Sequence, residues 1–327
     1  MEKVDVSVCV ATYNQENYIR QALDSIFMQR TNFNFEVIVG EDSSPDNTRQ
    51  ILLEYKEKYG DKLVLLLHEK NLGPSGNTRS IHEKVRGRYI AFLEGDDYWT
   101  DEYKLQKQYD VLENNPQYSA VCSDFMHVDP EGNTIKESVL NMKKSVVKTM
   151  KDWMKYGYSL HTCTIFRRNI FPETDEKYIK LVTAEPTMGD LISFTLLYDA
   201  GDICVLKDVM SAHRMAGEND ASSFAYKNKT QSIKYTHMFI RIMHNLEEYL
   251  DHKYDFSPRI CNRIAGVKFG KIFGGLKYKS SEMREITKHL PLKMKINIYY
   301  RLTRMIVRKI VKRIKLYCSK LRSLYAR

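Results

Sequence analysis

Acidic residues stand at the end of a predicted strand, where they could hold a cation. The segment "IAFLEGDDYW" turns from an apolar run into Glu94, Asp96 and Asp97. Adjacent carboxylates repel each other and are poor strand residues, so they cost stability unless something positive lies between them. A turn that only caps the next helix is the alternative, and the Asp pair alone does not separate the two interpretations.

Polar residues also follow two other predicted strands. Thr12 and Tyr13 come at the end of the strand predicted over 5–12, and Asp42 ends the one predicted over 35–42. In open α/β sheets, ligands bind beyond the carboxyl ends of the strands. Three strands that bring polar groups to one edge favour a binding site over three unrelated turns.

The first hundred residues alternate between strand and helix patterns, which predicts an α/β fold with a mostly parallel central sheet covered on both faces. The predicted strands are 5–12, 35–42, 62–69 and 88–94, and the predicted helices are 17–29, 45–60 and 75–85. Further along we predict a strand over 118–129, a strand that runs into a helix over 160–171, a helix over 189–201 and short strands over 202–214.

Beyond Tyr226 the pattern becomes helical, over 226–250, 258–278 and 295–327. We therefore predict two parts, an α/β domain over 1–225 and a helical C-terminal region over 226–327.

The bulk composition indicates a folded protein that does not cross a membrane. Of the 327 residues, 43% are hydrophobic and 11% aromatic, which is enough for a sizeable core. The N-terminus shows no signal-peptide pattern and the chain has no span of 18 apolar residues, so we expect a cytoplasmic protein. The six cysteines form no CxxC pair, which favours reduced thiols over a disulfide framework or a zinc site.

Five segments occur in a fixed order, namely "VSVCVATYNQENYIRQALDSIFMQ", "VIVGEDSSPDNT", "NLGPSGNTRS", "GRYIAFLEGDDYW" and "MGDLISFTLL". Together they resemble family 2 glycosyltransferases, which have the GT-A (Rossmann-like) fold. The resemblance covers about residues 4–220. It implies an inverting, metal-dependent enzyme that moves a sugar from a nucleoside-diphosphate sugar, expected to be UDP-linked, to a hydroxyl of a surface-glycan or lipid-linked acceptor.

The resemblance also assigns roles at the strand ends. Asp97 matches the metal ligand of the family's DXD-type motif, where Mg²⁺ or Mn²⁺ neutralises the leaving diphosphate. Asp96 would hold the ribose or a metal-bound water, and Asp42 would contact the base. Thr12 and Tyr13 would grip the nucleoside, with a tyrosine buried in the sheet edge as the alternative for Tyr13.

Two further residues match functional positions of the family. Asp190, in "MGD", matches the catalytic base that takes the proton of the acceptor hydroxyl, and an N-cap of the following helix is the alternative. The family's "YRxH" segment reads "HRMA" here, which leaves Arg214 as a candidate diphosphate contact. The usual histidine of that segment is Ala216, and the usual tyrosine is His213.

The positive net charge of +10 belongs to the C-terminal tail. Thirteen of the 51 Lys and Arg residues, and no Asp or Glu, lie between Ile286 and Arg327. Apolar residues recur there every three or four positions, at Leu302, Ile306, Ile310, Ile314, Tyr317, Leu321 and Leu324. At 100° per residue, the predicted opposite side carries Arg301, Arg304, Arg308, Lys312, Lys315 and Arg322.

A basic amphipathic helix of this form suits an anionic membrane surface, so we expect a peripheral protein on the inner face of the cell membrane. Packing onto the protein itself or a partner is a second interpretation. A nucleic-acid partner is not expected, because the tail offers few aromatic residues near its basic ones.

Two other functions compete with a glycosyltransferase. A sugar nucleotidyltransferase would need a triphosphate loop rich in Gly and basic residues after the first strand, and "ATYNQENY" is not one. The other is a non-catalytic membrane scaffold that retains the GT-A fold. Only a turnover measurement distinguishes this scaffold from an enzyme.

Overall fold

The computed structural model describes residues 3–157, 160–171, 175–184, 188–215, 228, 230–273, 276 and 278–325, with side chains described as far as 312. The chain divides into two compact units, Met1–Gly217 and Glu218–Arg327. The predicted boundary between 225 and 226 falls outside the described residues and stays a prediction.

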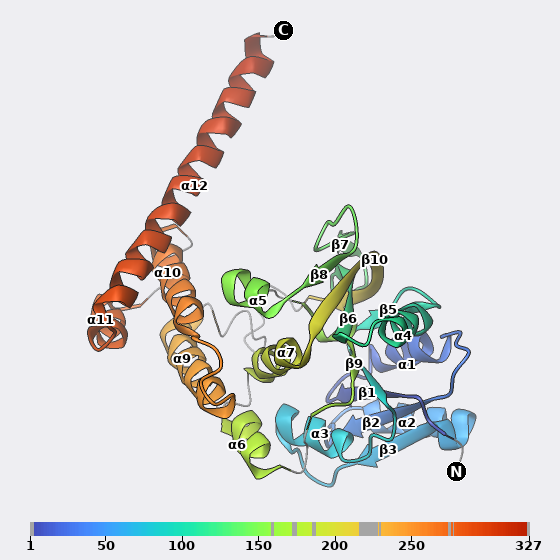
Figure 1. The fold of residues 1–327 in the computed structure, drawn as a ribbon. Coiled ribbons are helices and arrows are strands. Elements are labelled where there is room, and N and C mark those ends of the chain that lie inside the picture. Colours follow the sequence, from blue (N-terminus) through green and yellow to red (C-terminus); the bar gives the residue numbers. More distant parts are fainter. Residues whose placement is uncertain are drawn as a thin grey trace. The chain divides into compact units, whose positions relative to one another are not determined.

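The first unit is built on one mixed sheet (Figure 1). Its strands are β1 (Val6–Thr12), β2 (Phe35–Glu41), β3 (Leu63–Leu67), β4 (Tyr89–Glu94), β5 (Tyr98–Trp99), β6 (Tyr118–Val128), β7 (Thr134–Lys136), β8 (Val146–Lys148), β9 (Phe166–Arg168) and β10 (Asp202–Arg214). Its helices are α1 (Ile19–Phe27), α2 (Thr48–Tyr59), α3 (Gly73–His82), α4 (Lys104–Asn114), α5 (Met150–Tyr156), α6 (Glu176–Ala184) and α7 (Gly189–Ala200).

The strand order is β3-β2-β1-β4-β9-β6-β10-β5, with β7 added to β6 and β8 added to β10. The strands from β3 to β4 are parallel, as are β6 and β10. The pairings of β9 with β4 and β6, and of β5, β7 and β8 with their neighbours, are antiparallel. The predicted α/β fold is confirmed, with its parallel part in the first hundred residues.

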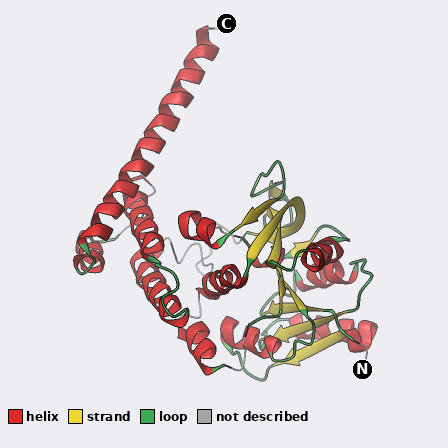
Figure 2. Ribbon diagram, viewed as in Figure 1, coloured by secondary structure: helices red, strands yellow, loops and turns green. Residues whose placement is uncertain are grey.

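Helices cover both faces of this sheet (Figure 2). On β1, Val8 and Val10 face the core formed with α1, α2 and α4, whereas Cys9 between them faces the side covered by α3. The same alternation occurs on β4, where Ala91 and Ile90 point to opposite faces. A strand buried on both sides reads as a continuous apolar run, which explains the sequence pattern.

Two local predictions differ from the structure. Residues 160–171 contain a 3-10 turn, Thr162–Thr164, followed by β9, and residues 169–171 are not helical. A proline follows Phe171, and the residue before a proline disfavours the helical conformation. Residues 202–214 form one long strand rather than several short ones. Its pairing with β6 shifts register at three places but continues to Arg214.

The second unit is helical, as predicted. It contains α9 (Ser232–Tyr249), α10 (Ser257–Phe273), α11 (Ser280–Lys288) and α12 (Leu292–Tyr325). Helix α12 packs along α10, with Ile298 fully buried and Leu302 and Ile306 partly buried. Arg301, from the predicted basic side, donates to Asn262 of α10, so this residue contacts the protein.

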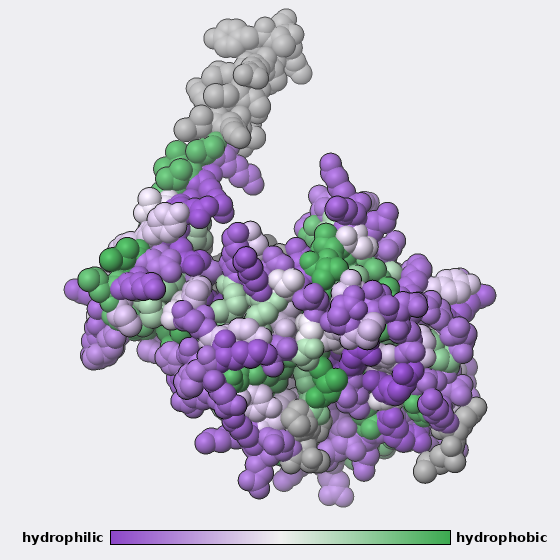
Figure 3. Space-filling model, in the orientation of Figure 1, coloured by the Kyte–Doolittle hydropathy of each residue, from purple (hydrophilic) through white to green (hydrophobic). Residues whose placement is uncertain are grey.

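A second apolar row of α12 is exposed, and hydrophobic and hydrophilic surface alternate along the described part of the helix (Figure 3). Its members are Leu292, Ile296, Tyr299, Tyr300, Val307, Ile310 and Val311. Arg304, Arg308 and Lys312 are exposed beside it. Packing therefore accounts for Leu302 and Ile306 of the predicted stripe, and Ile310 belongs to the exposed row.

The rest of the predicted stripe cannot be placed. The side chains of Ile314, Tyr317, Leu321 and Leu324, and of the basic Lys315 and Arg322, lie outside the described residues. Within the described part of the chain, no helix combines the length and the apolar character needed to span a membrane.

Candidate functional site

The carboxyl ends of β1, β2 and β4 meet at one edge of the sheet. In the strand register, Thr12 lies opposite Glu41 and Ala11 lies opposite Glu94. The Asp42 amide donates to the Thr12 carbonyl at 3.1 Å, which continues the ladder past the end of both strands. The structure therefore brings together the three polar clusters that the sequence places at strand ends.

Gly95 allows the acidic turn after β4 to pass close to β1. A Cβ atom at this position would lie 2.1 Å from Oε1 of Gln15 and 2.7 Å from Oγ1 of Thr12. These two side chains are themselves joined, since Thr12 Oγ1 donates to Gln15 Oε1 at 2.9 Å. Any side chain at 95 would push this pair aside, so the turn requires glycine.

The acidic turn buries a carboxylate whose two oxygens have different partners. Oxygens of Glu94, Asp96 and Asp97 lie within 4.8 Å of one another. Asp97 is 1% exposed, and its Oδ1 accepts from the backbone amide of Arg214 at 2.9 Å. Its Oδ2 accepts no hydrogen bond of normal geometry from the described residues and lies 3.2 Å from Nδ1 of His161.

Crowding shifts the protonation of all three carboxyl groups. Burial, and then the charge of Glu94, raises the pKa of Asp96 to about 6. Burial raises the pKa of Asp97, although His161 opposes the rise. Glu94 keeps accessible surface but is surrounded by protein atoms, and burial raises its pKa against the effect of the same histidine. A cation beside these oxygens would favour their charged forms.

The predicted nucleoside residues flank the turn. Tyr13 is 47% exposed, so the alternative of a tyrosine buried in the sheet edge does not fit. Asp42 is buried, and its Oδ1 accepts from the amide of Leu72 at 2.7 Å while its carbonyl accepts from Asn71 Nδ2 at 3.1 Å. Asp42 thereby ties the end of β2 to the loop before α3.

Asp190 lies in the first turn of α7, two residues after the N-cap position, which is Met188. The N-cap alternative for Asp190 was therefore wrong. Burial raises the pKa of Asp190, and His161 opposes the rise. The Asp190 carboxylate in turn contributes to the raised pKa of Glu94, which places Asp190 within electrostatic reach of the acidic turn.

The guanidinium of Arg214 donates hydrogen bonds to groups of the protein itself. Its Nε donates to the Asp96 carbonyl at 2.9 Å, and one terminal nitrogen donates to the carbonyls of Asp129 and Pro130 at 3.1 and 2.8 Å. The other terminal nitrogen donates to Oε1 of Gln21 at 2.7 Å. This geometry favours a role in holding the acidic turn over the predicted contact with a diphosphate.

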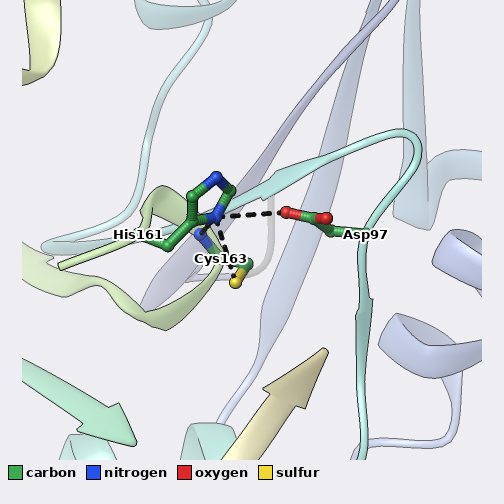
Figure 4. Close-up of side chains that lie close together, drawn as sticks. All are labelled: Asp97, His161 and Cys163. Carbon is green, nitrogen blue, oxygen red and sulfur yellow. Dashed lines mark hydrogen bonds and ion pairs between the residues drawn. The ribbon is translucent and has the colours of Figure 1, made fainter. Parts of the chain in front are cut away.

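The sequence analysis missed His161 and Cys163, which contact the acidic turn (Figure 4). Nδ1 of His161 lies 3.2 Å from Asp97 Oδ2 and 3.3 Å from Cys163 Sγ. Nε2 lies 3.8 Å from Glu94 Oε2. The ring stacks on His213 with 3.6 Å between the ring centroids.

The pKa values of the two stacked imidazoles shift in opposite directions. Burial works against protonation of His161. Its pKa is nevertheless raised well above the usual value by Cys163, Asp97 and Glu94. Burial raises the pKa of the Cys163 thiol to about 11, so the thiol is neutral near neutral pH and the carboxylates account for the shift. Burial, and then His161 and His127, lower the pKa of His213 to about 3.

The direction of β9 explains why His161 lies here. β9 runs antiparallel to β4, with Phe166 opposite Ala91, so residues before β9 lie beside residues after β4. A polar "HTCT" directly before the apolar "IF" was the available signal. It could not be interpreted without knowing which strand is the neighbour of β9.

A family model gives the decisive comparison, because the model described as glycosyl transferase family 2 matches residues 7–174, about half of the chain. The chain belongs to glycosyl transferase family 2. The match contains β1, β2 and β4, the acidic turn and the segment of His161 and Cys163.

Relatives within this family cover parts of the chain. An uncharacterised protein of Mycobacterium tuberculosis is 43% identical over 117 residues, which cover 36% of this chain and 34% of that protein. TuaG of Bacillus subtilis, which is named as a teichuronic acid biosynthesis glycosyltransferase, is 31% identical over 164 residues, 46% of this chain and 64% of TuaG. The chain thus spans about a third of the length of the first curated relatives that it matches.

Solved structures show the same fold. S. aureus TarS in complex with UDP has a TM-score of 0.58 at 20% identity, over 86% of this chain and 78% of that chain. A mannosyltransferase of Pyrobaculum calidifontis, in complex with GDP-Man and Mn²⁺, has a TM-score of 0.51 at 14% identity, over 93% and 88%. The GT-A fold expected from the sequence is confirmed by these structures.

The residues of the acidic turn fit a divalent cation. The buried Asp97 carboxylate lies beside two further carboxylates, whose oxygens lie within 4.8 Å of its own. Hard divalent cations prefer such oxygen ligands. A cation beside these carboxylates would offset the burial and the mutual repulsion that raise their pKa values.

We expect Arg214→Lys to destabilise the protein without any ligand present. A lysine cannot reach the carbonyls of Asp96, Asp129 and Pro130 together, and each buried acceptor left unpaired costs about 1–3 kcal/mol. The measurement is urea unfolding of the nucleotide-free protein. Arg79→Lys is the control, because the Arg79–Glu83 ion pair is exposed and should shift stability by less than about 0.5 kcal/mol. Unchanged stability together with lost nucleotide binding would instead support the diphosphate contact.

Proposed function

We propose that the protein is an inverting, metal-dependent glycosyltransferase that uses a nucleoside-diphosphate sugar, with UDP as the nucleotide. The observation that carries the proposal is the buried Asp97 carboxylate, which lies beside two further carboxylates and whose Oδ2 is paired with His161 Nδ1 at 3.2 Å. A protein keeps such an arrangement where a cation and an anionic ligand complete it.

Two observations support the choice of donor. TarS, which shares the fold, has been crystallised with UDP and with UDP-GlcNAc. In this chain, the exposed ring of Tyr13 offers a stacking surface beside the buried carboxylate of Asp42. We assign Thr12, Tyr13 and Asp42 to the nucleoside and Asp96 to the ribose or a metal-bound water.

Asp97 is the residue that would hold the metal, with Mg²⁺ or Mn²⁺ as candidates. When bound, the ion supplies charge neutralisation to the diphosphate leaving group. Mn²⁺ accompanies GDP-Man in the Pyrobaculum mannosyltransferase, which supports the same class of ion here. Arg214 fixes the turn that presents Asp97, through the Arg214 amide and guanidinium.

Asp190 is the base in this proposal. The acceptor hydroxyl oxygen attacks the anomeric carbon, its proton passes to a carboxylate oxygen of Asp190, and the bond from that carbon to the diphosphate oxygen breaks on the opposite side. The raised pKa of Asp190 suits proton uptake, since a base works best with a pKa near the operating pH. Attack opposite the leaving group inverts the anomeric centre.

The acceptor in this proposal is a surface glycan or a lipid-linked saccharide, reached at the inner face of the cell membrane. The exposed apolar row of α12, flanked by Arg304, Arg308 and Lys312, supports attachment to an anionic surface. TuaG, a family relative, is named for teichuronic acid biosynthesis, which supports a polymer acceptor.

UDP should stabilise the protein only when Mg²⁺ or Mn²⁺ is present, because the acidic turn would hold the ion that neutralises the charge of the diphosphate. At 100-fold over the dissociation constant, the gain is about 2.7 kcal/mol. A thermal-shift titration of nucleotides with and without metal measures this. Asp97→Asn should abolish the metal-dependent part. The absence of any shift with every nucleoside diphosphate and metal tested would sink the donor assignment.

Asp190→Asn should bind the donor normally and lose transfer by about 10²- to 10⁴-fold, because the amide cannot accept the acceptor proton. Single-turnover transfer to a defined acceptor measures this, alongside nucleotide binding. Asp199→Asn, on the same helix, is the matched control and should transfer normally. Near-normal transfer by the Asp190 variant would show that Asp190 is not the base. Absence of turnover in the unmodified protein would favour a non-catalytic scaffold.

Replacing Val307, Ile310 and Val311 together by serine should weaken binding to anionic vesicles. These side chains are exposed, so the fold should remain, and their insertion is worth at least about tenfold in partitioning. Co-sedimentation at low and high salt measures the loss, and salt should release part of the unmodified protein. Ile272→Ser, an exposed position on α10, is the control. Equal sedimentation of the triple variant would mean that this row does not face a membrane.

A further inference from the structure

The helical unit contains a cavity lined mainly by α9 and α10. Its volume is about 450 Å³, which lies within the usual range for small-molecule sites. Arg259 and Arg263 of α10 line it from positions four residues apart, which lie on the same face of a helix. Gly266 lines the cavity next on α10, and a Cβ atom there would meet no atom of another described helix within 4 Å. The missing side chain therefore keeps this wall open.

The wall that α10 contributes is basic. The helix sequence, "SPRICNRIAGVKFGKIF", contains Lys and Arg but neither Asp nor Glu. The described residues that line the cavity include no carboxylate. Burial lowers the pKa of Arg263, and it lowers the pKa of Arg259 to about 10, so both guanidiniums remain charged at neutral pH. An anion beside them would favour these charged forms.

Two polar atoms of the lining are buried and have no hydrogen-bond partner among the described residues. Ser232, the first residue of α9, is 2% exposed, and its Oγ is one of these atoms. Arg263 donates from Nη2 to Oδ1 of Asn228 at 2.7 Å, but its Nε is the second such atom. Buried polar groups are costly unless a hydrogen bond satisfies them. Two helices therefore present donors to one cavity that a ligand could use.

We propose that this cavity binds a terminal phosphate group. A phosphate offers three acceptor oxygens and about two negative charges, which suits the guanidiniums and the hydroxyl together. A carboxylate has fewer oxygens and a smaller charge, so it would leave donors without acceptors. Phe239, Val267 and Leu276 form an apolar part of the lining, beside which an apolar molecule carrying the phosphate could pack. The inference goes beyond the proposed function, because the described lining lies entirely in the second unit.

Calorimetric titration of the full chain with sodium phosphate, and separately with sodium acetate, tests the cavity at matched ionic strength with EDTA present. EDTA removes the divalent ions that the proposed donor site requires, so failure of the donor proposal leaves this titration interpretable. We expect phosphate to bind at least about tenfold more tightly than acetate, because it accepts more charge-assisted hydrogen bonds. Equal binding of the two anions, or no binding of phosphate, would overturn the proposal.

Arg263→Gln should weaken phosphate binding by about 10- to 100-fold, because it removes a charged donor. Lys271→Gln is the matched control, since it removes the same charge from an exposed position of α10 outside the lining and should bind phosphate normally. Circular dichroism verifies that each variant is folded. Unchanged binding by folded Arg263→Gln would contradict the assignment. Should this variant fail to fold, Arg263→Lys replaces it, because lysine keeps the charge but cannot form paired hydrogen bonds.

Ser232→Ala separates a binding role from a structural one. It should weaken phosphate binding by about 3- to 10-fold, the contribution of one hydrogen bond. Without phosphate, urea unfolding should show equal or higher stability, because the variant removes a buried hydroxyl that has no partner among the described residues. Lower stability together with unchanged phosphate binding would show that Ser232 is structural and would remove it from the site.

Dihexanoyl phosphatidic acid, kept below its micelle concentration, distinguishes a lipid phosphate from a free one. Dihexanoyl phosphatidylcholine is its control, because choline covers the phosphate. Affinity at least about tenfold above that of inorganic phosphate, and lost in Arg263→Gln, would support the cavity and identify a lipid headgroup. Affinity equal to that of inorganic phosphate, and likewise lost, would support the cavity and identify a free phosphate. Equal binding of both lipids that Arg263→Gln leaves unchanged would count against the cavity.

Discussion

The buried carboxylate of Asp97 is the constraint on which the first unit depends. A charged oxygen removed from water requires compensation, and repulsion from Glu94 and Asp96 makes the requirement larger. The protein supplies a backbone amide from β10 on one side and an imidazole from the segment before β9 on the other. Gly95 permits the close approach to β1. Strands β9 and β10 therefore complete a site that β1, β2 and β4 begin.

The parallel part of the sheet, and the polar groups at its edge, could be predicted because both are local patterns. Buried strands read as apolar runs, and Thr12, Asp42 and Asp97 follow three such runs. Parallel strands end at the same edge, so the sequence order of these residues was enough to predict that they meet. That convergence required no knowledge of long-range pairing.

The contribution of His161 could not be predicted, because it depends on the antiparallel pairing of β9 with β4, whose paired residues lie 75 to 79 positions apart in the chain. The same reason applies to Cys163. Spacing rules for metal sites look for cysteines close together in the chain, and here one cysteine lies beside residues from other elements. Arg214 was predicted from its match to a family segment. No sequence pattern indicated its hydrogen bonds to Gln21 and to the Asp96 carbonyl.

Helix α12 shows a different limit of sequence patterns. A repeat of three or four residues predicts an apolar stripe but does not say what the stripe contacts. In the structure Ile298, Leu302 and Ile306 face α10, and Arg301 joins that contact through Asn262. The exposed row with Val307 and Ile310 lies on another side of the same helix. The periodicity was therefore correct, while the assignment of faces needed the neighbouring helix.

Arg214 also marks a junction in the chain. It is the last residue of β10, and the second compact unit begins four residues later, at Glu218. The residue whose amide donates to Asp97 is therefore the last residue of the sheet before the chain continues to the helical unit. A change of register at the end of β10 would therefore move this amide away from Asp97 Oδ1 and shift the acidic turn.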